Sequence, residues 1–278
     1  MRFSNLHNHS TYSDGKGTLR ENIEAAIAKK MSAIGFSDHS YTACDESYCM
    51  MLSDYPDYIR EVRALKEEYK DKIKVYLGIE KDYYSDINPA DFDYVIASVH
   101  YIVRGGKCYP IDHSLEQQEE CLAEVFGGDK LKMAKCYFKM VYEHVKATRP
   151  TFIGHYDVIS KFGFMPEDDG EYIKIANFYL QKCLEICKYV EVNTGGIARG
   201  VRTFPYPHKK MLECIKENGG ELLLSADSHK CENLDFYFKE SVEILKNMGF
   251  SHIVEFDGEG FKKIEIITTR QTGGLHKG

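Results

Sequence analysis

The sequence predicts an α/β fold, a distorted seven-stranded (β/α)7 barrel similar in plan to a TIM barrel, with a metal site at its C-terminal mouth. Short β-rich runs alternate with longer stretches at helical period, which is typical of parallel sheets and barrels. Seven apolar runs end near residues 7, 37, 79, 99, 154, 192 and 225. The 278 residues suffice for one barrel, which usually takes about 250 residues.

Two helices are expected between the first three strands. Thr18 with Glu21 forms a capping box, which opens a helix that ends near Lys30. A second helix is predicted from about Pro56 to Tyr69. The residues expected on the inner faces of these helices are Ile23, Ala26, Ile27, Ile59, Val62 and Leu65.

Two consecutive helices are expected between the strands that end at His100 and at His155. Ser114 and Gln117 form a capping box for the first, and a Gly127-Gly128 pair ends it. The second has the longest regular pattern in the chain, with apolar residues at spacings 3-4-3-4: Leu131, Ala134, Phe138, Val141 and Val145.

The C-terminal part continues the alternation. One helix is marked by Ile173, Ala176, Leu180, Leu184 and Cys187, and another by Met211, Leu212 and Ile215. A final helix, from about Leu234 to Met248, precedes weak strands at Ile253–Phe256 and Ile264–Ile267. No linker or repeat interrupts the pattern, so we expect a single domain over residues 1–267 and a polar tail over 268–278.

Composition narrows the possible partners. The 36 Lys and Arg against 43 Asp and Glu give a net charge of -7, which argues against a surface for long nucleic acid. No apolar run approaches the ~20 residues that span a bilayer, so no membrane partner is expected. Nine cysteines, scattered singly, and the lack of an N-terminal apolar h-region indicate a cytoplasmic protein. Cys183 and Cys187, four apart, are expected to be core residues rather than a metal pair.

Histidines and acids lie at equivalent positions, directly at the ends of successive apolar runs. His7 and His9 are two apart on a strand and therefore leave the same face, and Asp227 and His229 repeat that spacing. Of eleven histidines, six fall at strand ends: 7, 9, 39, 100, 155 and 229. A single such histidine is more often a hydrogen-bonded core residue, but buried polar groups repeated at one mouth would each need a partner. The pattern therefore predicts a polynuclear metal site, since imidazole and carboxylate are metal ligands.

The same segments resemble the polymerase and histidinol phosphatase (PHP) family. The motifs that carry the resemblance are His7-x-His9 with Ser13-Asp14, Ser37-Asp38-His39, Glu80 with Ser98-Val99-His100, Gly154-His155, Asn193-Thr194-Gly195-Gly196, and Ser225-Ala226-Asp227-Ser228-His229. They extend over about residues 3 to 250. Within the family the chain most resembles stand-alone histidinol-phosphate phosphatases, because it lacks the large added domains of the replicative and family X polymerases.

The resemblance implies three divalent metal ions. The first would be held by His7, His9, Glu80 and Asp227, the second by Glu80, His100 and His155, and the third by Asp14, His39 and His229. Mixed imidazole and carboxylate ligation suits Zn, Mn or Fe. Among these residues we expect Glu80, Asp227 and His229 to be catalytic.

The charge balance favours a phosphate substrate independently. Three divalent ions bring about +6, three carboxylates about -3 and a bridging hydroxide -1, which leaves about +2 for a phosphomonoester dianion. We expect that hydroxide to attack phosphorus in line. Arginine has the fork geometry for phosphate, and the expected substrate contacts are Arg199, Arg104, Asn193 and His113. Loop acids that could face the cationic part of histidinol are Asp112, Glu116, Asp45 and Asp157.

Three functions are compatible with the sequence. The leading hypothesis is hydrolysis of L-histidinol phosphate, a small phosphomonoester, to L-histidinol and phosphate in histidine biosynthesis. The alternative enzyme is a PHP-type phosphoesterase acting on nucleotides or oligonucleotide ends, against which the acidic net charge counts. A metal-stabilised module without turnover is disfavoured, because the full set of ligands is present.

Overall fold

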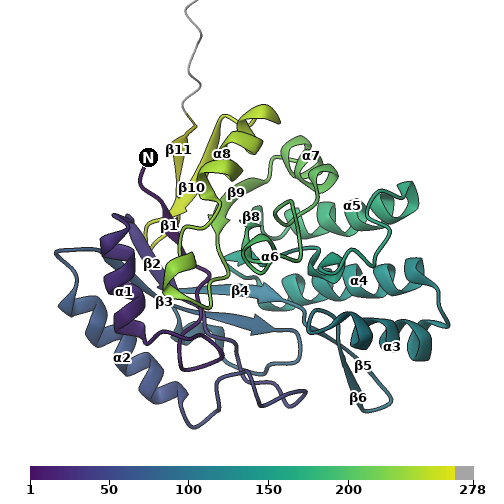
Figure 1. The fold of residues 1–278 in the computed structure, drawn as a ribbon, viewed down its shortest axis with the longest axis horizontal. Coiled ribbons are helices and arrows are strands. Elements are labelled where there is room, and N and C mark those ends of the chain that lie inside the picture. Colours follow the sequence, from purple (N-terminus) through teal and green to yellow (C-terminus); the bar gives the residue numbers. More distant parts are fainter. Residues whose placement is uncertain (267–278) are drawn as a thin grey trace, which may run out of the picture.

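The computed structural model describes residues 1–266 and has seven parallel strands in the order β1-β2-β3-β4-β7-β8-β9 (Figure 1). They are β1 (Ser4–Asn5), β2 (Ala33–Phe36), β3 (Lys74–Asp82), β4 (Tyr94–Ser98), β7 (Phe152–Ile153), β8 (Tyr189–Asn193) and β9 (Glu221–Ser225). Each strand lies within or close to one of the seven runs identified in the sequence. The predicted seven-stranded barrel is confirmed.

The barrel closes where the first and last strands of the sheet meet. The backbone N–H of Ser228 donates to the carbonyl of His7, and the N–H of His9 donates to the carbonyl of Ser228, at 3.1 and 2.9 Å. These bonds join the segments just after β1 and β9 in parallel register, with Asn8 opposite Ser228. The closure therefore lies between two segments that carry predicted metal ligands.

Helices cover the outside of the barrel, with α1 and α2 on one side and α3, α4 and α5 on the other (Figure 1). Their bounds are α1 (Leu19–Ala28), α2 (Tyr55–Glu68), α3 (Leu115–Phe126), α4 (Lys130–Thr148), α5 (Gly170–Leu184), α6 (Gly195–Ala198), α7 (Lys209–Glu217) and α8 (Phe238–Asn247). The capping box of Thr18 and Glu21 is present. Ser114 caps α3, and Gly127 ends it in the left-handed conformation, with φ 60°.

Two regions differ from the prediction. The last helix begins at Phe238 rather than at Leu234, because residues 231–233 form a 3₁₀ turn and Leu234 is fully buried in the core. A hairpin of β5 (Tyr101–Arg104) and β6 (Lys107–Pro110) was not predicted. Its two-residue turn is Gly105-Gly106, both at positive φ, which is the backbone that tight hairpins need.

A second hairpin lies at the amino end of the barrel. The weak C-terminal strands pair as an antiparallel hairpin of β10 (His252–Phe256) and β11 (Phe261–Glu265), while Ile267 and the predicted tail lie outside the described residues. Val254 and Phe256 of this hairpin belong to one apolar cluster with residues inside the barrel: Leu6, Ala33, Tyr76, Tyr94, Ile96, Phe152 and Leu223. The hairpin thus seals the barrel at the end opposite the mouth.

Cys44 and Cys108 form a disulfide between the loop after β2 and strand β6. Nothing in the spacing of the nine cysteines predicted this pair. Cys183 and Cys187 are buried in the core and unpaired, as expected. Among the residues that the structure describes, no helix is both long and apolar enough to cross a membrane.

Candidate metal centre

The nine predicted ligands converge at the mouth of the barrel. Their ligand atoms fall into four overlapping groups, within each of which all atoms lie within 4.8 Å of one another. The groups are His9, Asp14, His39 and His229; His7, Glu80 and His155; His7, His9 and Asp227; and His39, Glu80 and His100. The family resemblance implied three sets of ligands, and most residues of each set also lie together in the structure. The exception is that His100 and His155, expected in one set, fall into separate groups around Glu80.

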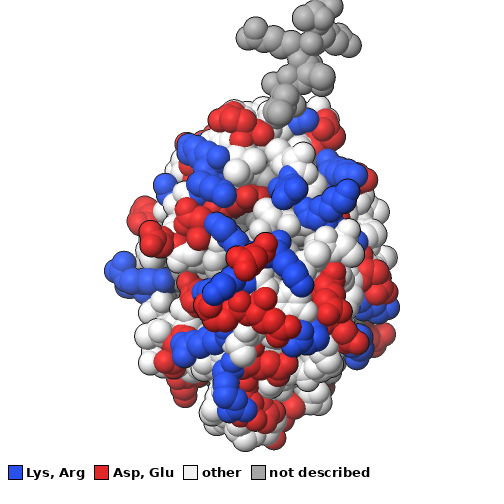
Figure 2. Space-filling view, turned by 90° about the vertical axis from the view of Figure 1, so that its left-hand side faces the viewer, with Lys and Arg blue, Asp and Glu red and all other residues white. Residues whose placement is uncertain are grey.

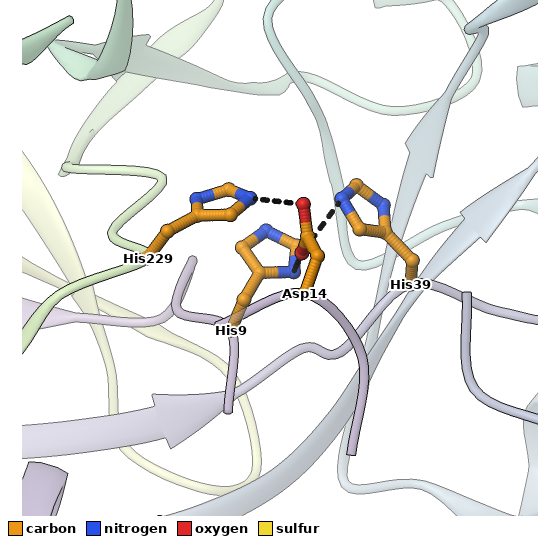
Figure 3. A group of neighbouring side chains, drawn as sticks. All are labelled: His9, Asp14, His39 and His229. Carbon is orange, nitrogen blue, oxygen red and sulfur yellow. Dashed lines mark ion pairs between the residues drawn. The ribbon is translucent and has the colours of Figure 1, made fainter. Parts of the chain in front are cut away.

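The outermost group is built around Asp14 (Figure 3). Its carboxylate lies 3.1 Å from His229 Nε2, 3.7 Å from His39 Nε2 and 4.0 Å from His9 Nδ1. These side chains come from the segments after β1, β2 and β9, and they point toward one another. The arrangement offers three imidazoles and one carboxylate to a single cation.

Glu80 lies at the centre of the innermost groups. Its side chain is buried on β3, and the two carboxylate oxygens face different imidazoles. Oε2 lies 2.8 Å from His39 Nδ1 and 3.3 Å from His7 Nε2, whereas Oε1 lies 3.0 Å from His155 Nε2 and 3.4 Å from the Nε2 of His100. A carboxylate so placed can contact two ions at once, one through each oxygen.

Asp227 faces both the ligand cluster and an arginine. One oxygen lies 3.1 Å from His9 Nε2, and the other accepts a hydrogen bond from Arg199 at 3.1 Å. The backbone of Asp227 is left-handed, with φ 47°, a conformation that Asp tolerates better than most residues. A Cβ on Gly195 would lie 2.9 Å from the Asp227 carboxylate and 2.5 Å from Arg199, so glycine is needed there for this close approach.

Asp38, in the middle of the Ser37-Asp38-His39 motif, faces away from the ligands. Its carboxylate accepts hydrogen bonds from the Ser10 backbone at 2.7 Å and from the Ser13 hydroxyl at 2.6 Å. These contacts fold the loop after β1 back on itself. Asp38 therefore holds in place the loop that carries Asp14.

The buried groups shift one another's pKa values. Burial opposes charge on His7, but Glu191 and Glu80 raise its pKa well above the usual 6.5. Burial, together with the charge of His39, lowers the pKa of His9 to about 3. Burial alone would raise the pKa of Glu80, yet the imidazoles of His7 and His39 hold it well below its usual value. Protons on imidazole thus balance the carboxylates, and metal ions would replace those protons on binding.

A metal ion fits this donor set. Four buried nitrogen and oxygen atoms of the predicted ligands have no hydrogen-bond partner in the described structure: His7 Nε2, His9 Nδ1, Asp14 Oδ1 and His155 Nδ1. An unsatisfied buried polar atom costs about 1–3 kcal/mol, and the first three of these atoms face the groups described above. Mixed nitrogen and oxygen donors suit a borderline divalent cation such as zinc or manganese.

A cavity of about 220 Å³ opens beside the cluster. Arg199 and His113 line it, together with Lys161, Tyr48, Tyr101 and Tyr206. Arg104 does not line it, because it lies at the exposed tip of the β5–β6 hairpin. Asn193 is completely buried and donates to Glu191 instead. The structure thus places two of the four predicted substrate contacts at the cavity.

One of the four loop acids named from the sequence reaches the cavity. Asp112 lines it and pairs with Lys161 at 3.3 Å. Burial opposes its charge, but Lys161 and nearby imidazoles lower the pKa of Asp112 to about 2. Glu116 is exposed on α3, Asp45 is held by Ser47 in the loop after β2, and Asp157 is completely buried.

Sequence reasoning missed several residues around the centre. Lys161 and Tyr48 follow no strand end, so no pattern distinguished them from ordinary loop residues. Asp82 lies two residues after Glu80, and Glu191 interrupts the apolar run of β8. An acid within a buried strand is itself a signal, because few such acids are buried without a partner.

The outer surface carries charges of both signs. On the face that includes α1 and α2, Lys and Arg alternate with Asp and Glu, and no continuous basic patch forms (Figure 2). The pairs there include Arg20 with Glu68 and Lys66 with Asp93. This face does not have the basic surface that a long nucleic acid requires.

The chain is similar to several known proteins. The PHP domain model matches residues 5–195. A probable histidinol-phosphatase of Schizosaccharomyces pombe is 28% identical over 86% of this chain and 83% of its own length. A histidinol-phosphatase of Lactococcus lactis is 26% identical over 93% of this chain and 96% of its own.

Solved structures share the fold. The histidinol phosphate phosphatase of Lactococcus lactis, complexed with Zn, L-histidinol and phosphate, has a TM-score of 0.71 at 23% identity, covering 94% of this chain and 99% of that one. A putative histidinol phosphatase of Listeria monocytogenes has a TM-score of 0.74 at 19% identity, covering 85% and 99%.

Proposed function

The chain belongs to the PHP domain family, and we propose that it is a metal-dependent phosphomonoesterase that hydrolyses L-histidinol phosphate to L-histidinol and phosphate. One observation carries the proposal: nine side chains that could bind metal ions converge beside a small cavity that an arginine lines. The names of the relatives and the ligands of the Lactococcus lactis structure support the choice of substrate.

The size of the cavity supports a small substrate. Its volume of about 220 Å³ is below the roughly 300–1,000 Å³ of pockets for drug-sized ligands. A small phosphomonoester fits such a space, whereas an oligonucleotide needs an open groove. The mixed charges of the surface favour the same choice.

The family resemblance implies three ion positions, and Glu80 would be shared by the first two; the convergence of the nine candidate ligands supports a centre of more than one ion. Bound divalent ions would supply positive charge for the phosphate oxygens and would lower the pKa of the attacking water. The imidazoles must be neutral to act as ligands, so bound ions would displace the protons that the carboxylates favour on rings such as His7.

The chain's own residues orient the substrate. Arg199, held by Asp227 at 3.1 Å, offers its remaining N–H groups to the phosphate. Tyr48 and Tyr101 form an aromatic wall, with ring centroids 6.2 Å apart, for the imidazole of the substrate. Asp112 is the one acid among the described lining residues that is not a candidate ligand, and we assign it to the substrate amine.

The deciding experiment compares kcat/KM for L-histidinol phosphate, nucleoside monophosphates and a dinucleotide. We expect histidinol phosphate to be preferred by at least about 100-fold, because each hydrogen bond to a charged group contributes about 1.5–3 kcal/mol. A preference for the dinucleotide would instead support the alternative phosphoesterase.

Chelation separates both enzymes from a module without turnover. Metal removal should abolish hydrolysis reversibly, and adding zinc or manganese back should restore it. A purified, metal-free protein that retains full activity would contradict the proposal.

A further inference from the structure

Glu191 lies behind the metal centre, and the proposed function gives it no direct contact with substrate. It occupies the middle of β8 between Val190 and Val192, and its side chain is completely buried. A buried carboxylate has an effective penalty of several kcal/mol unless its neighbours compensate for it. Its contacts should therefore explain why a charge is kept there.

Four groups meet the two oxygens of Glu191: one from β8 itself, one from β9 and two from the segments after β1 and β7. Oε2 lies 2.9 Å from His7 Nδ1 and accepts a hydrogen bond from the Ser225 hydroxyl. Oε1 accepts from the backbone N–H of His155 and from the Asn193 amide, the latter at 2.8 Å. The carboxylate is thus fully hydrogen-bonded, and it contacts the segments of two candidate ligands, His7 and His155.

The other nitrogen of His7 faces the metal centre. Nε2 lies 3.3 Å from Glu80 and 3.7 Å from Asp227, and it has no hydrogen-bond partner among residues 1–266. A neutral imidazole carries its proton on one nitrogen and its lone pair on the other. A carboxylate at Nδ1 keeps the proton there, so the lone pair of Nε2 points at the place where an ion would bind.

We propose that Glu191 is a positioning residue for the metal centre, which fixes the tautomer and orientation of His7 and holds the segment of His155 beside it. The proposal rests on the metal-dependent function proposed above. It predicts that Glu191 acts on metal affinity first and on turnover only through the bound metal.

A similar contact supports this role. Asp82 lies 3.2 Å from Nδ1 of His100, and it also accepts from the backbone N–H of His100 at 3.1 Å. Nε2 of His100 faces Glu80. Two candidate ligands from different strands therefore have a carboxylate on the nitrogen turned away from the centre, which is a common means of orienting ligand histidines.

The test is Glu191→Gln, which keeps the size of the side chain but removes its charge. An amide has one oxygen that accepts and one NH₂ that donates. If the NH₂ faces His7, the Nδ1 proton of His7 loses its acceptor, and if the NH₂ faces the backbone N–H of His155, two donors oppose each other. We expect the affinity for zinc, measured by competition with a chromophoric chelator, to fall about 10–100-fold. At saturating zinc, KM for the phosphomonoester should change less than threefold.

Ser225→Ala is the matched control, because it removes one hydrogen bond from the same carboxylate but keeps the charge and the His7 contact. Its zinc affinity should stay within threefold of the wild type even if the metal-free Tm falls as much as in Glu191→Gln. Equal losses of affinity in the two variants, or none in Glu191→Gln, would overturn the positioning role. Wild-type protein that binds none of zinc, manganese and iron would contradict the proposed function itself.

A measurement on the wild type covers the case in which Glu191→Gln does not fold. The ¹⁵N chemical shifts of the zinc-loaded protein, with His7 assigned by its loss in His7→Asn, should report a protonated Nδ1 and a ligated Nε2. A ligated Nδ1 would overturn the proposal.

Discussion

The two ends of the barrel interior use inward-facing positions of the same strands for opposite purposes. At the mouth, the strand ends supply His7 and His9, which are buried, polar and incompletely hydrogen-bonded. At the amino end, Tyr94 and Phe152 stack with ring centroids 6.0 Å apart, under the β10–β11 hairpin. Within the barrel interior, apolar packing is therefore confined to the amino end, and the costly polar cluster is confined to the mouth.

Asp227→Asn tests the mouth and should have the largest effect. The asparagine amide is a weaker metal ligand than the carboxylate that lies beside His9. It also lacks the negative charge that holds Arg199. Loss of about 4 kcal/mol of transition-state stabilisation by a metal corresponds to about a 10³-fold lower kcat. The metal-free Tm should move by less than a few degrees. Steady-state kinetics and calorimetry measure both, with Asp45→Asn as the control, and near-normal turnover would refute the assignment.

Arg199→Ala tests the contact between chain and substrate. A hydrogen bond to a charged group contributes about 1.5–3 kcal/mol, so KM for the phosphomonoester should rise about 10–100-fold. Arg104→Ala, at the hairpin tip outside the cavity, should leave KM unchanged. If both variants behave alike in initial-rate assays, the cavity is not the substrate site.

Gly78→Ala tests the opposite end. A Cβ at this position would lie 2.1 Å from the ring of Tyr94, which is fully enclosed and must shift. Such overpacking costs about 1–3 kcal/mol, measurable as a lower midpoint in urea. KM of the folded fraction should not change. A variant with normal stability but altered KM would mean that the two ends are coupled.

Asp157→Asn should have the smallest effect. Burial raises the pKa of Asp157 to about 6, despite the charge of Arg202. Because this pKa exceeds the usual 3.8, the folded protein prefers the protonated form of Asp157. The contribution of Asp157 to the free energy of unfolding is therefore largest below about pH 4, and it is lost as the pH rises through 6. The neutral variant should be about 1–2 kcal/mol more stable at pH 8 and equal at pH 4. Urea unfolding at both values would detect the difference, and equal stability at pH 8 would contradict it.

Local patterns were sufficient for much of this molecule. Strand ends and i, i+2 spacing brought out His7, His9, Asp227 and His229, because parallel strands direct their ends to one mouth. The β5–β6 hairpin was missed although its Gly105-Gly106 turn is a local signal for a tight hairpin. The Cys44–Cys108 pair was missed because it depends on how distant segments meet. Lys161 and Tyr48 were missed for the same reason. Glu191 carried a signal, an acid within an apolar strand, but its partners are known only in three dimensions.

The seam that Ser228 closes against His7 has a consequence for how the enzyme is made. A ribosome releases residues in order, and Asp227 follows His9 by 218 positions. A nascent chain therefore exposes its first imidazoles long before the last ligands leave the exit tunnel. The complete set of candidate ligands can therefore bind metal ions only at the end of synthesis, when the earliest and latest segments of the polypeptide first come together.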